Sequence, residues 1–144
     1  MSLGRDYDIS TVVAGTDYRD PAAGKSISMR FTDYSFGSVR VEGVAYDHDL
    51  IIDCGKIRKR KKAASRRYRD EYGHTPLSGA EHIPWQCRRL VIGTGADGAL
   101  PVMPQVHDEA RRRKVDLVVL PTVQAIELLA GTTGDTNAVL HLTC

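Results

Sequence analysis

Apolar and polar residues alternate between residues 37 and 53, which is the pattern of half-buried β-strands. Val39 and Val41 alternate with polar neighbours, an apolar stretch follows at 44–46, and a short apolar run stands at 50–52. The Glu-Gly pair between the first two stretches has the composition of a tight turn. The pattern therefore predicts an antiparallel meander in the N-terminal half.

The C-terminal half alternates strand patterns with helix patterns. The apolar run at 115–120 is nearly continuous, which is typical of a strand covered on both faces of a sheet. Pro104 suits the first turn of a helix, and Thr122 stands where an N-cap hydroxyl is expected. This alternation indicates at least one right-handed βαβ unit. We predict strands at 89–92, 115–120 and 138–142, and helices at 104–114 and 122–130.

Residues 56–77 interrupt these patterns with charge. Nine of the 20 basic residues, and no acidic residue, fall within 56–69, which leaves 11 basic and 18 acidic residues elsewhere. Because helical periodicity is poor, we expect an extended basic loop over 56–77. One short helical turn is expected after it, where Ser78 and Glu81 have capping-box spacing. Segregated charge of this kind matters more for partners than the net charge of +2.

A chain of 144 residues has the size of one domain. We expect residues 1–30 to form an N-terminal arm, with a short strand at 9–13, and residues 31–144 to form a single α/β domain. The sequence contains no apolar run of membrane-spanning length and no secretory leader pattern, so we expect a cytoplasmic protein. Three cysteines, an odd number, fit a reducing compartment and argue against a disulfide framework.

The run Gly93-Thr94-Gly95-Ala96-Asp97-Gly98 follows a predicted strand and has the spacing of a dinucleotide-binding loop. Such a loop must open directly into a helix, and the next strand must end in an acidic residue. Here a proline-containing stretch, 99–104, intervenes, and the next strand ends without an acid, so we expect no cofactor. Two interpretations stay open. The glycines permit close backbone packing, or the loop forms a small crevice for an anion or polar ligand, lined by Gly93, Thr94, Gly95, Gly98, Pro121 and Thr122.

Acid–base chemistry at this loop has two weak candidates, Asp97 and His141. His141 reaches the loop only if the last strand runs parallel to the strand at 89–92. An acid in a tight turn more often caps the backbone, so we predict no catalytic residue. The five histidines show no metal-ligand spacing with one another or with cysteine, and no metal site is predicted.

The basic segment could bind phosphate groups, with Tyr68 and Tyr72 nearby to stack nucleic-acid bases. The alternative is a solvated loop whose charge faces the acidic remainder of the chain or a partner subunit. No recognised nucleic-acid module surrounds the segment. The candidate phosphate-binding residues are Arg58, Lys59, Arg60, Lys61, Arg66 and Arg67.

Four separated motifs occur in an order that resembles one known family: Tyr34–Gly37, Leu90–Gly95, Leu117–Thr122 and Leu140–Cys144. This family is the domain of unknown function shared by the adipogenesis-associated domain-containing protein and a mitochondrial complex I assembly factor. The basic insertion resembles a prokaryotic subgroup. The resemblance covers about residues 31–144 and implies a three-layer α/β fold with a mixed central sheet. It implies no established activity, substrate or cofactor.

Three functions stay open on these observations. The first, which we predict, is a non-catalytic binding or assembly-type module, with its crevice at 93–98 and a protein partner, a second copy of the chain or a small polar ligand. The second is an enzyme acting on a small anionic or polar substrate at the same loop, which requires titratable groups within hydrogen-bond reach of a concave site. The third is nucleic-acid binding through 56–69.

Overall fold

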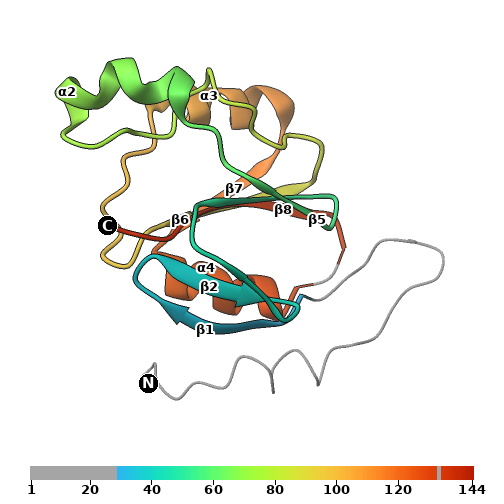
Figure 1. Ribbon diagram of the computed structural model, residues 1–144. Helices are drawn as coiled ribbons and strands as arrows, with labels where there is room; N and C mark the ends of the chain where they lie inside the picture. The colour runs from blue at the N-terminus through green and yellow to red at the C-terminus, as the bar shows by residue number, and fades with distance from the viewer. Residues whose placement is uncertain (1–28, 133) are drawn as a thin grey trace.

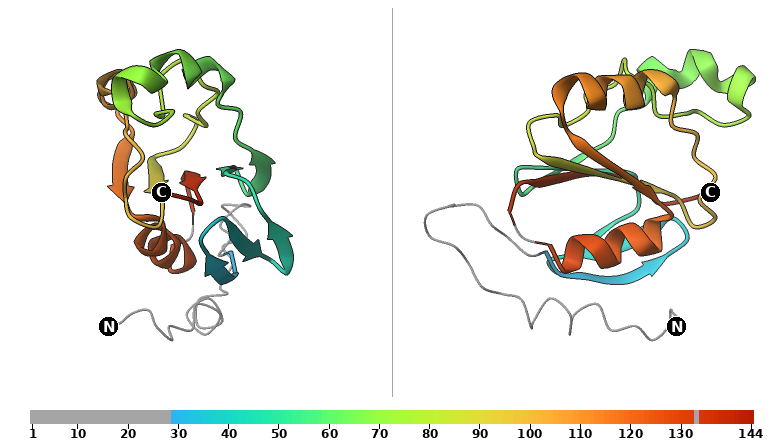
Figure 2. Two further views of the ribbon diagram at one scale, coloured as in Figure 1. Left: turned by 60° about the vertical axis from the view of Figure 1, so that its left-hand side comes forward. Right: turned by 180° about the vertical axis from the view of Figure 1, so that it is seen from behind.

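The computed structural model describes residues 29–132 and 134–144, which form three layers (Figures 1 and 2). The middle layer is a five-stranded mixed sheet in the order β5-β4-β8-β6-β7. Helix α3 (Pro104–Arg113) covers one face of this sheet, and helix α4 (Thr122–Ala130) covers the other together with a small second sheet. The predicted three-layer α/β class is confirmed. The expected strand at 9–13 lies outside the described residues, and the domain boundary at residue 30 stays a prediction.

The small sheet is an antiparallel meander of β1 (Phe31–Ser35), β2 (Ser38–Val41) and β3 (Val44–Tyr46). The meander was predicted, but the assignment of 50–52 to it was wrong. β4 (Leu50–Asp53) instead joins the central sheet, where it pairs antiparallel with β8. The reason is burial: Leu50 and Ile52 pack toward α4, and Ile51 packs toward α3. A strand that buries consecutive residues needs cover on both faces.

The basic segment is largely ordered into regular elements, which corrects the expectation of an extended loop. β5 (Lys56–Lys59) forms a hairpin with β4, and the helical turns η2 (Ala63–Tyr68) and α2 (Arg69–Tyr72) follow. Lys56–Lys59 was expected to be loop because its charges mask the strand pattern. The turn expected at Ser78–Glu81 is present, but Glu81 does not close a capping box, because its carboxylate binds Arg60.

Three parallel strands form the other side of the central sheet: β6 (Arg89–Thr94), β7 (Asp116–Leu120) and β8 (Thr136–His141). β6 lies between the other two, and all but one of its residues are buried. β7 was expected to be covered on both faces, but it is the edge strand and Val119 is 38% exposed. An edge position leaves one side of β7 without a neighbouring strand, which explains this partial exposure.

Both long helices begin and end close to the predicted residues. α3 starts with Pro104 in its first turn and ends at Lys114, which has left-handed backbone geometry. α4 ends before Gly131. Val106 and Ala110 of α3 lie in the hydrophobic cluster above the sheet, and Ile126 of α4 lies in the cluster below it. The two helices therefore anchor the strands from opposite faces and fix the positions of the loops at the strand ends.

Candidate functional site

The carboxyl ends of the three parallel strands bring together the segments that the sequence singled out. β8 runs parallel to β6, with Thr94 aligned to His141. The condition for placing His141 beside the glycine loop is therefore met. The loop 93–98, the Pro121-Thr122 pair and the segment 141–144 share one edge of the sheet, which we call the carboxyl edge.

The backbone amides of the glycine loop are already bonded within the chain. The Gly95 N–H donates to the Thr122 hydroxyl at 2.7 Å. The Ala96 N–H donates to the Thr143 carbonyl at 3.1 Å, and the Asp97 N–H donates to the Cys144 carbonyl at 2.7 Å. An anion site needs amides that point at the ligand. The Ala96 and Asp97 amides instead hold the segment 143–144 against the loop, and the Gly95 amide ties the loop to the start of α4.

Two of the loop glycines are required by this close packing. Gly95 has a φ of +104°, and a Cβ at this position would lie 2.0 Å from the Thr143 carbonyl oxygen. A Cβ on Gly93 would lie 2.9 Å from the Thr122 hydroxyl. These contacts give the glycines a packing role. A ligand crevice at Gly93, Thr94, Gly95, Gly98, Pro121 and Thr122 stays a prediction.

Thr122 does not cap its own helix, which corrects the expectation. Pro121 occupies the cap position, and Thr122 is the first residue of α4. The buried Thr122 hydroxyl accepts from the Gly95 N–H and donates to the His141 carbonyl at 2.6 Å. One hydroxyl therefore ties the glycine loop, the start of α4 and the end of β8 together.

His141 pairs with Asp49, a residue that the sequence analysis missed. The Asp49 carboxylate lies 2.6 Å from His141 Nδ1 and accepts the Leu142 N–H at 3.0 Å. His141 Nε2 lies 3.3 Å from the Thr143 hydroxyl, so its two ring nitrogens face Asp49 and Thr143, not Asp97. A carboxylate can only accept, so Nδ1 carries a proton and donates to Asp49.

The pKa of Asp49 is lowered to about 2. Burial alone would raise it, but the hydrogen bond and charge of His141, the Leu142 amide and the Arg60 charge together outweigh burial. Asp49 is therefore ionised at any ordinary pH. Its position just before β4, which runs antiparallel to β8, could have been anticipated only by knowing that those two strands pair.

Arg60 lies at the centre of a buried ion network behind this pair. Its guanidinium donates to both oxygens of Glu81 at 2.8 Å and to Asp49 at 2.9 Å. It also donates to the Pro76 carbonyl at 3.1 Å, and its side chain is 0% exposed. Burial disfavours the charged form, but Glu81 and Asp49 raise the pKa of Arg60 above its ordinary value. Arg60 therefore stabilises the interior of the protein by joining Glu81, Asp49 and the Pro76 carbonyl.

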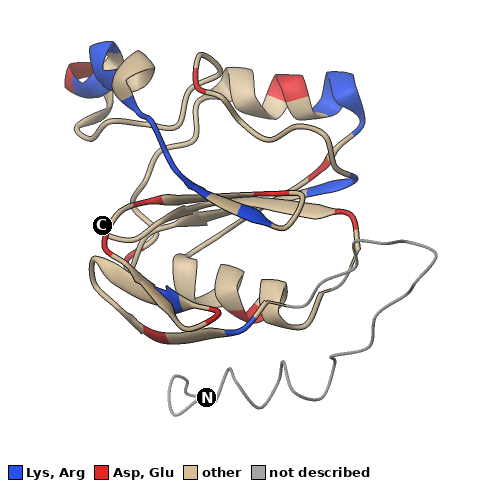
Figure 3. Cartoon of the chain, turned by 45° about the vertical axis from the view of Figure 1, so that its right-hand side comes forward, with Lys and Arg blue, Asp and Glu red and all other residues tan. Residues whose placement is uncertain are grey.

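The other candidate phosphate-binding residues differ in their surroundings. Arg58 donates to Asp53 and to the His82 carbonyl. Lys59, Lys61 and Arg66 are exposed. Arg67 lies over the Tyr68 ring, with its guanidinium carbon 5.0 Å from the ring centroid. Figure 3 shows Lys and Arg along the segment 56–69 and, separately, at the C-terminal end of α3.

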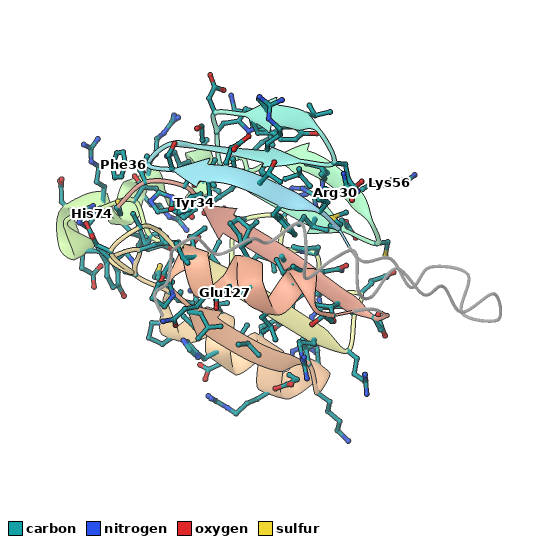
Figure 4. The ribbon with its side chains drawn as sticks, turned by 90° about the horizontal axis from the view of Figure 1, so that it is seen from below. Arg30, Tyr34, Phe36, Lys56, His74 and Glu127 are labelled. Carbon is teal, nitrogen blue, oxygen red and sulfur yellow. The ribbon has the colours of Figure 1, made fainter. Side chains whose placement is uncertain are left out.

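Tyr34 connects the small sheet to the carboxyl edge. Its hydroxyl donates to the Leu142 carbonyl at 3.4 Å, while Phe36, two residues further on, is 67% exposed (Figure 4). Burial raises the pKa of Tyr34, although contact with Thr122 lowers it in part, so the hydroxyl stays protonated and can donate. On the far side of the edge, His74 Nδ1 lies 3.6 Å from the Cys144 thiol.

An open groove of about 620 Å³ lies away from this edge, along α3. Gln105, Glu109 and Arg113 line it from one stripe of the helix, because residues four apart share a helix face. The segment 79–85 forms the opposite wall, and Arg67 with Tyr68 completes it. The sequence pattern predicts the helix but not this stripe, because a polar i, i+4 pattern is also what a solvated helix face shows.

Each of two arginines in the groove stacks on an aromatic ring. Arg113 lies 5.6 Å from the Trp85 ring centroid, and Arg67 lies over Tyr68. The acidic residues of the groove are paired: Glu81 binds Arg60, and Glu109 binds Arg112 and Arg113. The hydrogen bonds from Arg112 and Arg113 hold the pKa of Glu109 at about 2. The groove is therefore lined by two arginines and by two acidic residues that are each paired with an arginine, and Arg67 of the basic segment forms part of it.

These features define a three-layer α/β domain whose carboxyl edge is packed with its own chain and whose open groove lies beside α3. Residues 31–140 match the family described as "Protein of unknown function (DUF498/DUF598)". The chain belongs to this family. A search of curated proteins found none that matches.

Solved structures support the same fold. The conserved hypothetical protein PH1505 of Pyrococcus horikoshii is 25% identical, with a TM-score of 0.65, and the match covers 81% of this chain and 100% of that one. The protein MT938 is 28% identical, with a TM-score of 0.57 and the same coverage. A Bordetella pertussis protein described as a Mth938-like domain is 18% identical over 87% of this chain and 90% of its own, with a TM-score of 0.51. In the described part of the chain, every helix is too short or too polar to cross a membrane.

Gly95→Ala should lower the free energy of unfolding by at least about 3 kcal/mol, because the new Cβ would overlap the Thr143 carbonyl in a strained backbone conformation. Gly43→Ala is the matched control. Gly43 also has a positive φ, +82°, but its Cβ would meet nothing within 4 Å, so a cost of about 1 kcal/mol is expected. Urea unfolding of both variants measures the difference. Equal costs would contradict the packing role of the loop.

Asp49→Asn should reduce the loss of unfolding free energy that the wild type shows as the pH falls below about 4. The Asp49 pKa is depressed in the folded state, so its stabilisation is present above the ordinary value near 3.8 and is lost as the pH falls toward 2. The stabilisation that depends on ionisation of Asp49 amounts to about 2 kcal/mol. Urea unfolding between pH 5 and pH 2.5 should show wild type converging on the variant as pH falls. Asp116→Asn, which removes an exposed partner of Arg89, should run parallel to wild type. A constant gap for Asp49→Asn would refute the assignment.

Proposed function

We propose that this chain is a non-catalytic binding module that holds an anionic partner in the groove along α3. The observation that carries this proposal is the groove itself, about 620 Å³ in volume and lined by two arginine–aromatic pairs. This volume lies within the range of ordinary ligand sites, about 300–1,000 Å³. Arginine stacked on an aromatic ring is held in place while keeping donors for an anion.

The geometry of the carboxyl edge supports placing the partner elsewhere. The three loop amides that could hold an anion or an oxyanion are donated to Thr122, Thr143 and Cys144. A crevice at this loop would require the segment 143–144 to leave. The groove along α3 needs no such rearrangement, because it is already open.

The resemblance of four sequence motifs to a domain of unknown function, described under Sequence analysis, supports the same proposal. The domain shared with the adipogenesis-associated domain-containing protein and the complex I assembly factor carries no assigned catalytic residue. An assembly-type role in the cytoplasm, with a macromolecular partner in the groove, is the form of this proposal that fits that resemblance. The basic segment 56–69, which contributes Arg67 to the groove and contains no acidic residue, favours an acidic partner.

A second candidate function is acid–base catalysis at His141. The observation that favours it is the line of Asp49, His141 and the Thr143 hydroxyl, with separations of 2.6 and 3.3 Å. An acid behind a histidine that faces a hydroxyl is the arrangement that activates a nucleophile. We rank this function second, because the neighbouring amides are bonded to the chain and would not stabilise an oxyanion.

The groove proposal is tested with the fluorescence of Trp85, which is the single tryptophan of the chain and lines the groove. Titration with heparin, used as a generic polyanion, should change this fluorescence saturably. Arg113→Gln should weaken binding several-fold, because a charged hydrogen-bond donor is lost. Arg111→Gln is the matched control on the same helix turn: Arg111 pairs with Asp108 and lies outside the groove. Equal losses in both variants, or heparin binding without a Trp85 response, would contradict the proposal.

A further inference from the structure

Resting on the proposed function, we propose that the anionic partner in the groove is a single-stranded nucleic acid. Its bases would stack on Trp85 and Tyr68, and its phosphates would contact Arg113 and Arg67. Single-strand binding combines a cationic groove with aromatic side chains, because every base has a flat face that can stack. Two arginines and two aromatic residues line this one groove, and its two acidic residues are each paired with an arginine.

The length of the groove suits a short stretch of one strand. Its helical wall extends over nine residues, from Gln105 to Arg113, and is about 12 Å long. Gln105 accepts the Gly79 N–H at 2.6 Å, and Arg113 stacks on Trp85. The segment 79–85 therefore runs alongside α3 over that whole length. Stacked nucleotides advance about 3.4 Å each, so the wall spans about three of them.

The guanidinium groups in the groove keep donors for phosphate. Arg113 binds Glu109 through Nε, and within the described residues no acceptor bonds its two terminal nitrogens. Arg67 donates one terminal nitrogen to the Tyr68 hydroxyl at 2.9 Å. Lys61, Lys62 and Arg66 are exposed beside it on the same segment. Two phosphate-binding positions, with further exposed cations on the same segment of chain, match a polyanionic backbone.

The aromatic rings favour nucleic acid over an acidic peptide. A peptide carboxylate would bind the arginines without covering the rings of Trp85 and Tyr68, whereas a nucleic-acid base stacks on an aromatic face. A duplex hides its base faces in the stack, so single strands should be preferred. Trp85 and Tyr68 are half-buried, which fixes the rings without covering them fully. The interpretation therefore turns on whether these rings contribute to binding.

The test measures anisotropy of a fluorescein-labelled oligouridylate of about 12 nucleotides, within the site sizes of single-strand-binding folds. Trp85→Leu and Tyr68→Leu should each weaken binding about tenfold without changing the salt slope, since each removes a stacking face but no charge. Arg113→Gln should reduce the magnitude of the slope by about 0.7 between about 50 and 200 mM salt, the value for one phosphate contact on a single strand. Arg111→Gln should leave both quantities unchanged.

Two further probes make the outcomes distinct. The same oligouridylate paired with oligoadenylate should bind more weakly than the single strand, and labelled polyglutamate more weakly still. Should polyglutamate bind as tightly as the oligouridylate, unaffected by Tyr68→Leu, the nucleic-acid inference is overturned while the anionic groove stands. If neither probe nor heparin elicits a Trp85 response, both proposals fail. Tyr68 lies outside the two hydrophobic clusters, so its variant keeps the test valid where Trp85→Leu fails to fold.

Discussion

The buried guanidinium of Arg60 is the interaction on which the rest of the structure depends. It joins three segments of the chain: the residue just before β4 through Asp49, the chain at 76–81 through Glu81 and Pro76, and the basic segment 56–69, to which Arg60 belongs. Removing one partner of a buried ion pair leaves the other unpaired and typically costs about 3–5 kcal/mol. The η2 turn is held by the same network, because buried Ser65 donates to Glu81 at 2.5 Å. Arg60 therefore helps to fix both the groove wall formed by η2 and the wall formed by 79–85.

The same network separates two surfaces of the protein. On the inner side, Asp49 accepts hydrogen bonds from Arg60, His141 and the Leu142 amide. It thereby links the network to the tightly packed carboxyl edge, where the Gly95 amide, the Thr122 hydroxyl and the His141 carbonyl bond to one another. On the outer side, Glu81 lines the groove, but its negative charge is neutralised by Arg60, so it does not repel an anion there. Because the glycine loop 93–98 packs against the chain's own C-terminal segment, the open groove along α3 is the surface that is free to bind a partner. This division is why we assign the partner to the groove along α3 and not to the glycine loop.

Much of the fold could be predicted from the sequence, and the reasons are local. Val39 with Val41, the apolar run of β7 and the proline that opens α3 each carry a periodic or positional signal. β4 could not be assigned to its sheet, because a run of buried residues does not indicate which strand it pairs with. Arg60 was grouped with eight other cations, since burial of one charge depends on Glu81 and Asp49, 21 and 11 residues away. Trp85 and Arg113 meet only once α3 has packed, so the candidate groove was beyond local pattern.

Amide chemical-shift mapping tests the central claim most directly, because it sees both candidate surfaces in one experiment. A ¹⁵N-labelled sample of the whole chain would be titrated with the oligouridylate. The groove assignment predicts that the Trp85 indole and the amides of 79–85 and Gln105 shift together and saturate, while the amides of Gly95, Ala96 and Asp97 stay in place. Shifts centred on Gly95–Asp97, with the Trp85 indole unmoved, would contradict the account and return the binding site to the glycine loop.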